Sequence, residues 1–172
     1  GQFNREIDEA LFESLFANFP EQEFRQMVER VREAMREKLS RNSWLQPETK
    51  QLALDKLELI RMQVVRPTVE KDWGFLPQRK YSTKKYLANL QVLAGASAQA
   101  GLAKVGRPAD KDVWGMGPLT VNAYFNPPET KFVMPVGILQ YPFFDVAGSL
   151  YENLGAVGMV VGHEVGHSFD DQ

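Results

Sequence analysis

The chain has 172 residues, of which 44% are hydrophobic and 24% charged, as in an ordinary globular protein. Its 22 acidic and 20 basic residues give a formal net charge of −2, which argues against a nucleic-acid partner because no phosphate-neutralising surface is expected. The absence of cysteine excludes disulfide frameworks and thiolate metal sites. No run approaches the roughly 18–20 apolar residues that cross a bilayer, so no transmembrane segment is expected in this chain.

Helical periodicity dominates the first part of the chain. Apolar residues recur at helical spacing from Ile7 to Phe19, and Pro20 ends that pattern. A second helix is predicted over residues 21–41, where an apolar stripe lies opposite a face rich in Arg and Glu. That charged face indicates a solvated surface with ion pairs four residues apart.

Two further helices are predicted before residue 106. One begins with Pro47 in its first turn and continues to the break at Arg66-Pro67. The other begins after a capping Ser82 and ends at Gly106, and its middle, rich in Ala, Gly and Ser, predicts close packing.

The pattern changes after Gly106. Apolar and polar residues alternate over 119–126, which predicts a strand, and the Asn-Pro-Pro-Glu-Thr sequence at 126–130 predicts a turn. A short return strand over 131–134 would complete a loose hairpin. From Val113 onward the chain carries six acidic residues but one lysine, so the two parts are expected to be different structural regions.

The last predicted helix begins at a capping box formed by Ser149 and Glu152. Glycines at 155, 158, 162 and 166 lie within it, and each costs about 0.8–1 kcal/mol relative to Ala in a helix interior. We therefore expect another backbone to pass very close to this helix.

The same helix carries the candidate metal-binding and catalytic residues. His163 and His167, the two histidines of the chain, stand four residues apart around Glu164 in an HExxH pattern. Residues at this spacing share one helix face, so both imidazoles can reach one ion, and residue type favours Zn²⁺. Zinc lowers the pKa of a bound water toward about 7. Glu164 is predicted to be the general base that takes the proton of this water, and not a ligand.

Catalytic zinc normally takes three protein ligands and keeps one open position. The chain supplies two histidines, and Asp170 and Asp171 lie too near His167 on the same helix to complete a tetrahedron. Two alternatives remain for these aspartates: they hold an imidazole N–H from behind the metal site, or they are solvated residues.

Taken together, these residues resemble the neprilysin and endothelin-converting-enzyme family of zinc metalloendopeptidases, in a bacterial member truncated just after the HExxH helix. The resemblance rests on the segments Trp44-Leu45, Glu48-Thr49-Lys50, 112–116, 121–124, 135–140, Phe143-Phe144 and 162–171. It implies that Asn122 and Ala123 bind substrate backbone, and an edge strand here would suit an extended peptide. It also implies that an apolar pocket accepts the residue after the cut; this pocket maps onto Ile138, Phe143, Met159 and Val160. Core packing is the alternative reading for each of these four side chains.

The resemblance also implies an architecture. The expected fold class is α+β and mostly helical: residues 1–105 belong to a helical capping lobe and its connection, and residues 106–172 form the first part of a thermolysin-like catalytic lobe. The family's third zinc ligand, a Glu, and its transition-state-stabilising His and Arg lie downstream in the rest of the parent chain. Family members are commonly periplasmic, secreted or on the cell surface.

The sequence thus predicts a zinc-dependent endopeptidase that cleaves oligopeptides on the amino side of hydrophobic residues. The 172-residue chain alone is expected to be inactive because it lacks the third ligand. The competing hypothesis is a non-catalytic helical, peptide-binding module or pseudo-enzyme fragment. The intact His163, Glu164 and His167 argue against degeneration of the parent.

Overall fold

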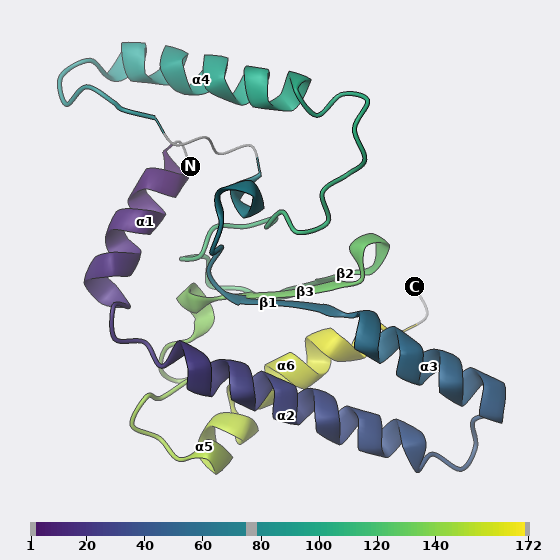
Figure 1. Ribbon diagram of the computed structural model, residues 1–172. Coiled ribbons are helices and arrows are strands. Elements are labelled where there is room, and N and C mark those ends of the chain that lie inside the picture. The colour runs from purple at the N-terminus through teal and green to yellow at the C-terminus, as the bar shows by residue number, and fades with distance from the viewer. Residues whose placement is uncertain (1–2, 75–78, 171–172) are drawn as a thin grey trace.

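The computed structural model describes residues 3–74 and 79–170. Helices surround one small mixed sheet, which confirms the predicted α+β, mostly helical class (Figure 1). The helices are α1 (Asn4–Leu15), α2 (Glu21–Ser40), α3 (Pro47–Leu59), α4 (Tyr86–Leu102), α5 (Leu150–Gly155) and α6 (Val157–Gly166). Short 3₁₀ turns lie at η1 (Glu70–Trp73), η2 (Pro127–Glu129) and η3 (Val136–Ile138). None of the helices among these residues is long and apolar enough to span a bilayer.

Strands β1 (Arg61–Val65), β2 (Tyr124–Asn126) and β3 (Lys131–Pro135) form the sheet in the order β1-β3-β2. The hairpin predicted after residue 119 is present, since β2 and β3 are antiparallel and η2 joins them. β1 pairs with β3 in parallel, with Arg61 opposite Lys131 and Val65 opposite Pro135. β2 is therefore an edge of the sheet within the described residues.

The prediction of one helix from Pro47 to Arg66 is wrong at its end. Helix α3 stops at Leu59, and the next residues form β1. The physical reason is non-local: β1 exists because β3, about seventy residues later in the chain, supplies its hydrogen-bonding partner. Local periodicity carries no information about that pairing.

The strand predicted from residue 119 is also shorter than expected, because β2 begins only at Tyr124. The preceding backbone packs on η3 instead, where Gly137 N–H donates to the Pro118 carbonyl at 2.9 Å. A Cβ built on Gly137 would lie 2.4 Å from the carbonyl oxygen of Leu119. Because Gly137 has no side chain, the backbone of residues 118–120 can pack directly on η3, and these residues do not extend β2.

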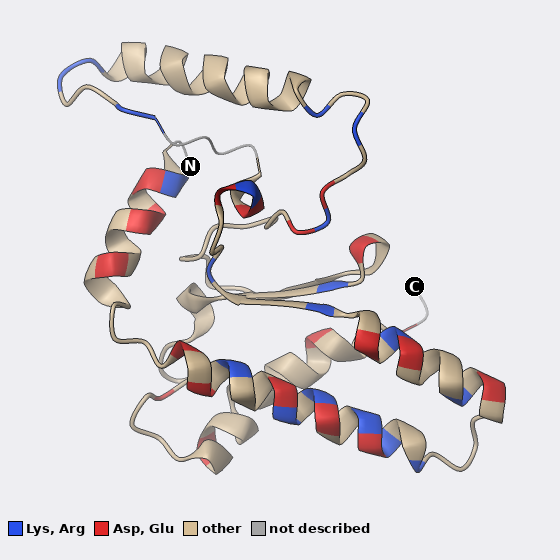
Figure 2. Cartoon of the chain, viewed as in Figure 1, with Lys and Arg blue, Asp and Glu red and all other residues tan. Residues whose placement is uncertain are grey.

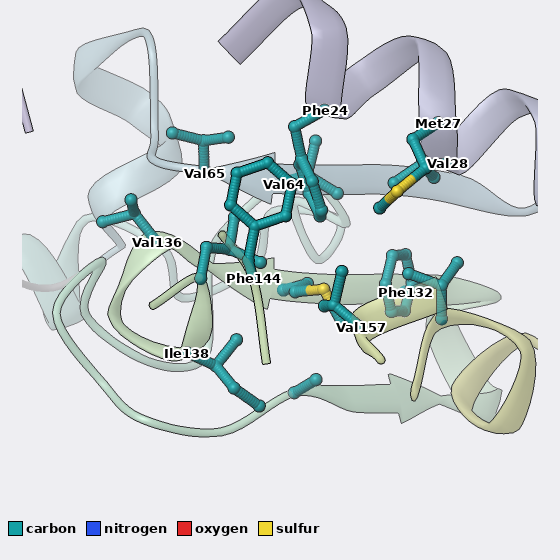
Figure 3. Close-up of a cluster of buried hydrophobic side chains, with 14 of the residues drawn as sticks. Phe24, Met27, Val28, Val64, Val65, Phe132, Val136, Ile138, Phe144 and Val157 are labelled. Carbon is teal, nitrogen blue, oxygen red and sulfur yellow. The ribbon is translucent and has the colours of Figure 1, made fainter. Parts of the chain in front are cut away.

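The two faces of the sheet differ in polarity. Side chains of Phe132 and Met134 in β3 and of Val64 and Val65 in β1 belong to the hydrophobic core. Gln63 and Lys131, at alternate positions of the two strands, instead donate to backbone carbonyls of residues 111–113. Helix α2 covers the apolar face with Phe24, Met27 and Val28, and Figure 3 shows these side chains with Phe132, Phe144 and Val157 in one cluster. Helix α6 packs on α2 and on β2 and β3. The core therefore joins segments from both predicted regions, and the boundary near residue 105 stays a prediction.

Helix α2 carries the expected solvated face. Its Arg and Glu residues alternate along the outer surface (Figure 2). Arg25 pairs with Glu21 at 2.7 Å and Arg41 with Glu37 at 2.6 Å, both four residues apart. The prediction of i,i+4 ion pairs is confirmed.

Helix α4 differs from its prediction in two ways. It begins after Lys85 without a side-chain cap, so Ser82 does not cap it. The close packing predicted for its small residues is found at Ala96, which is 6% exposed, but not at Gly95, where an added Cβ would meet nothing within 4 Å. Figure 1 shows α4 standing away from the sheet.

The predicted last helix is two helices. The capping box is confirmed, since Ser149 Oγ accepts from the backbone N–H of Glu152 and the Glu152 carboxylate accepts from the backbone N–H of Ser149. Ala156, with φ −95° and ψ −93°, is not helical and separates α5 from α6. The expected close backbone is not found among the described residues. Added Cβ atoms at Gly155 and Gly166 would meet nothing within 4 Å.

Candidate metal site

Helix α6 presents the two histidines because its other side is anchored in the core. Val157, Val161 and Val165 recur every four residues and are fully buried. His163 and His167 follow the same spacing on a different face, where His163 is exposed and His167 half-buried. A rigid, packed helix thus holds both imidazoles at the surface.

The two rings converge. The Nε2 atoms of His163 and His167 lie 3.1 Å apart, and the ring centroids are 4.5 Å apart. A tetrahedral ion with zinc–nitrogen bonds of about 2.0–2.1 Å would separate two ligating nitrogens by about 3.3–3.4 Å. A metal-free pair in suitable tautomers can make an N–H···N hydrogen bond in the same geometry. The imidazoles therefore fit a shared zinc ion with little rearrangement.

Asp170 is placed behind this pair. Its Oδ2 lies 2.5 Å from Nδ1 of His167, the ring nitrogen that points away from His163. A carboxylate at this position holds the Nδ1 proton and leaves the Nε2 lone pair free for a metal, which is a common support for zinc-binding histidines. Asp171, the other aspartate named from the sequence, lies outside the described residues.

Glu164 follows His163 directly, so its side chain leaves the helix about 100° away from the ligand direction. It is half-buried at the border of the histidine face. The role of Glu164 as the base that takes a proton from a zinc-bound water stays a prediction.

The described residues do not gather a complete set of ligands for a catalytic zinc ion. Within 3–74 and 79–170, no group of three or more His, Cys, Asp or Glu side chains gathers in a way that could hold a metal. The histidine pair accounts for two of the three protein ligands that catalytic zinc normally takes.

The predicted substrate residues lie immediately before the edge strand β2. Asn122 is exposed, and its Oδ1 accepts from the backbone N–H of Ala123 at 2.9 Å. Ala123 is buried, and both residues lead directly into edge strand β2. Open backbone groups at such an edge are where an extended peptide can add.

The four side chains of the predicted apolar pocket differ in burial. Ile138 belongs to the core and Val160 packs against that core. Phe143 and Met159 are 40% and 64% exposed. Core packing accounts for the first pair, and a pocket that includes all four side chains stays a prediction.

Comparison with known proteins adds to this geometry. Two different sequence models of peptidase family M13 match the chain, one over residues 3–67 and the other over residues 122–172. The chain belongs to peptidase family M13. Neprilysin-3 of Drosophila melanogaster is 36% identical over 152 residues, which are 86% of this chain and 19% of that protein.

Solved structures of the M13 chain's relatives agree in fold. PepO from Lactobacillus rhamnosis aligns with a TM-score of 0.81 and 29% identity over 98% of this chain and 27% of the other. The zinc metalloprotease Zmp1 of Mycobacterium tuberculosis, in complex with an inhibitor, aligns with a TM-score of 0.72 and 36% identity over 95% of this chain and 24% of the other. The chain spans between 19% and 30% of the length of the first curated relatives it matches.

Proposed function

We propose that this M13 chain carries the metal-binding helix of a zinc-dependent endopeptidase that hydrolyses oligopeptides on the amino side of hydrophobic residues. The observation that carries the proposal is the 3.1 Å approach of the His163 and His167 Nε2 atoms, with Asp170 behind one ring. Membership of family M13 and the names of relatives such as the zinc metalloprotease Zmp1 support it. Placement outside the cytoplasm is proposed from the family resemblance.

The chain's own residues would divide the work as follows. When bound, zinc supplies Lewis acidity that polarises a carbonyl and makes water nucleophilic near neutral pH. Glu164 would accept a proton from the attacking water and return it to the leaving amine nitrogen. Asn122 and Ala123 would hold the substrate backbone extended beside β2.

A second candidate is a non-catalytic, peptide-binding module. It is favoured by one observation, that the described residues bring together two metal ligands and not three. Peptide binding at the β2 edge needs neither the metal nor Glu164.

Zinc titration against a chromophoric chelator, in a protein of full family length that carries this sequence, tests the assignment. His163→Ala and His167→Ala are expected to abolish competition for zinc, whereas Glu164→Gln should compete as well as the unsubstituted protein. Loss of binding in Glu164→Gln would make Glu164 a ligand. Full binding in both alanine variants would remove the histidine site altogether.

Turnover is tested in a protein of full family length that carries this sequence. Glu164→Gln there should retain zinc and lose about two to four orders of magnitude of turnover, the scale of a general base. Near-normal turnover with zinc retained would favour the non-catalytic reading of Glu164.

A further inference from the structure

The polar face of the sheet is covered by a short segment, residues 111–115, which we call the strap. Figure 1 shows the chain descending from α4 and crossing the side of the sheet that faces away from α2 and α6. The strap is bonded to η1 as well, because the Trp114 N–H donates to the Asp72 carbonyl at 2.7 Å. Trp114 itself is buried.

Side chains from β1 hold the middle of the strap. Arg61 pairs with the Asp112 carboxylate, and Gln63 Nε2 donates to the Asp112 carbonyl. Lys71 adds a second ion pair to the same carboxylate at 3.1 Å. These bonds hold the pKa of Asp112 below its usual range, with the Lys71 hydrogen bond as the largest cause. Figure 2 shows basic residues at the beginnings of β1 and β3 and acidic residues on the strap.

Lys131 of β3 is the buried centre of this arrangement. Its side chain is 1% exposed, and Nζ donates to the carbonyls of Val113 at 2.5 Å and Lys111 at 3.2 Å. The third partner of the ammonium is the Glu129 carboxylate, at 2.5 Å. The three N–H donors of the ammonium thus meet three acceptors, so none of them is left buried without a hydrogen bond.

The same lysine reaches the hairpin tip. Oε2 of Glu129 also accepts from Asn126 Nδ2 at 3.0 Å, so Lys131 links the strap to the last residue of β2. At the first residue of β2, the Tyr124 hydroxyl accepts from the Gly115 N–H at 3.0 Å. This bond closes residues 116–123 into a loop whose two ends are fixed.

That loop contains Asn122 and Ala123, the residues proposed to contact substrate backbone. We propose that Lys131 is a positioning residue: its buried ammonium clamps the strap to the hairpin, so that the loop presents Asn122 and Ala123 in register with edge strand β2. The contacts that Lys131 makes do not depend on the proposed function. The role of Lys131 in peptide binding rests on that function. The Lys131 ammonium bonds to the strap carbonyls and to Glu129, and not to His163, His167, Asn122 or Ala123 in the described part of the chain, so it acts through the strap.

The chain contains no cysteine, which allows a chemical test of the ammonium alone. Lys131→Cys, alkylated while unfolded with 2-bromoethylamine and then refolded, carries an ammonium on a side chain close to lysine in length. Alkylation of the same variant with iodoacetamide places a neutral amide there. The measurement is amide hydrogen exchange, resolved by segment.

With the neutral group, exchange at residues 113–115 and 122–125 should become roughly tenfold faster, because a hydrogen bond to a charged group is worth about that factor. Exchange in α2 should not change, and the aminoethyl form should restore protection. Equal protection with both groups would overturn the clamp, and so would uniform loosening of α2 together with the strap.

Tyr124→Phe provides a second variant that preserves volume. It removes the acceptor of the Gly115 N–H and should raise exchange at Gly115, and at residues 122–125 as the loop loosens, by a smaller factor because the hydroxyl is a neutral acceptor. Tyr151→Phe on α5 is the matched control, since Tyr151 is 83% exposed, and it should change nothing. Unchanged Gly115 exchange in Tyr124→Phe would contradict the closed loop.

The link to peptides is measured in a protein of full family length. Lys131→Met and Tyr124→Phe should raise KM for a hydrophobic peptide with kcat and zinc content little changed. Loosened loops with an unaltered KM would overturn the positioning role. If the unsubstituted protein cleaves no peptide at all, the proposed function has failed, and the exchange experiment then still decides the clamp.

Discussion

At the scale of single residues, Asp170 is the side chain on which the metal site most depends after the histidines. Its contact with His167 Nδ1 fixes the tautomer that leaves Nε2 free. Asp170→Asn is therefore expected to lower zinc affinity by about 10–100-fold, the usual cost of losing such a partner. Chelator competition measures the affinity, with Asp55→Asn on α3 as the control. Equal affinity in Asp170→Asn would show that the contact does not support the metal.

Asp8 makes a second residue-scale prediction because it is a buried carboxyl on α1. Burial raises the pKa of Asp8 above its usual value. The folded chain therefore favours the protonated acid: this stabilisation is complete below the unfolded pKa and is lost as pH rises through the folded one. Asp8→Asn should raise the melting temperature at pH 7, and the gain should shrink below about pH 4.

The pKa of Glu70 is shifted in the opposite direction to that of Asp8. A hydrogen bond from Arg5 is the main cause that lowers the pKa of Glu70, so its stabilisation is present above the unfolded pKa and lost as pH falls. Glu70→Gln should lower the melting temperature at pH 7. Thermal scans at pH 3 to 8 check both variants, and a loss of stability in Asp8→Asn at pH 7 would contradict the first.

The residue scale also shows what sequence can and cannot reveal. His163, Glu164 and His167 were readable because their geometry follows from helical spacing within five residues. Lys131 gave no such signal. A lysine at the start of a strand normally reads as exposed, and the acceptors that bury it come from Glu129 and from a strap about twenty residues earlier.

At the scale of elements, helices α1 and α2 and the hairpin were predictable because local periodicity and turn chemistry define them. β1 was not, since it depends on pairing with a distant strand. The start of β2 was mispredicted for a similar reason. Apolar and polar residues alternate over 119–123 as in a strand, but this segment forms a loop that packs on Gly137.

Gly137 gives the element-scale prediction. An added methyl would overlap the backbone of Leu119 and Thr120, so Gly137→Ala should lower the free energy of unfolding by about 1–3 kcal/mol, the cost of overpacking. Gly95→Ala, in the open middle of α4, should instead raise it by about 0.5–1 kcal/mol. Urea denaturation measures both. A neutral Gly137→Ala would mean that residues 118–120 can move away at no cost.

At the scale of the whole molecule, helix α6 depends on other segments in two ways: for the packing of its valines and for completion of the metal site. Its valines need the core built by α2 and the sheet, and the described residues provide that core. Its histidines need a further ligand, which those residues do not provide. A folded scaffold and a complete metal centre are therefore separable properties of this chain.

That separation predicts how the 172-residue chain should behave on its own. Two imidazoles leave a zinc ion short of its usual three protein ligands, so the ion should bind weakly and water should be poorly placed beside Glu164. We expect a cooperatively folded chain that shows no cleavage of a fluorogenic hydrophobic peptide, even with added zinc. A protein of full family length that carries the same sequence should cleave that peptide. Cleavage by the short chain that a chelator blocks and Glu164→Gln abolishes would show that two histidines and a glutamate suffice.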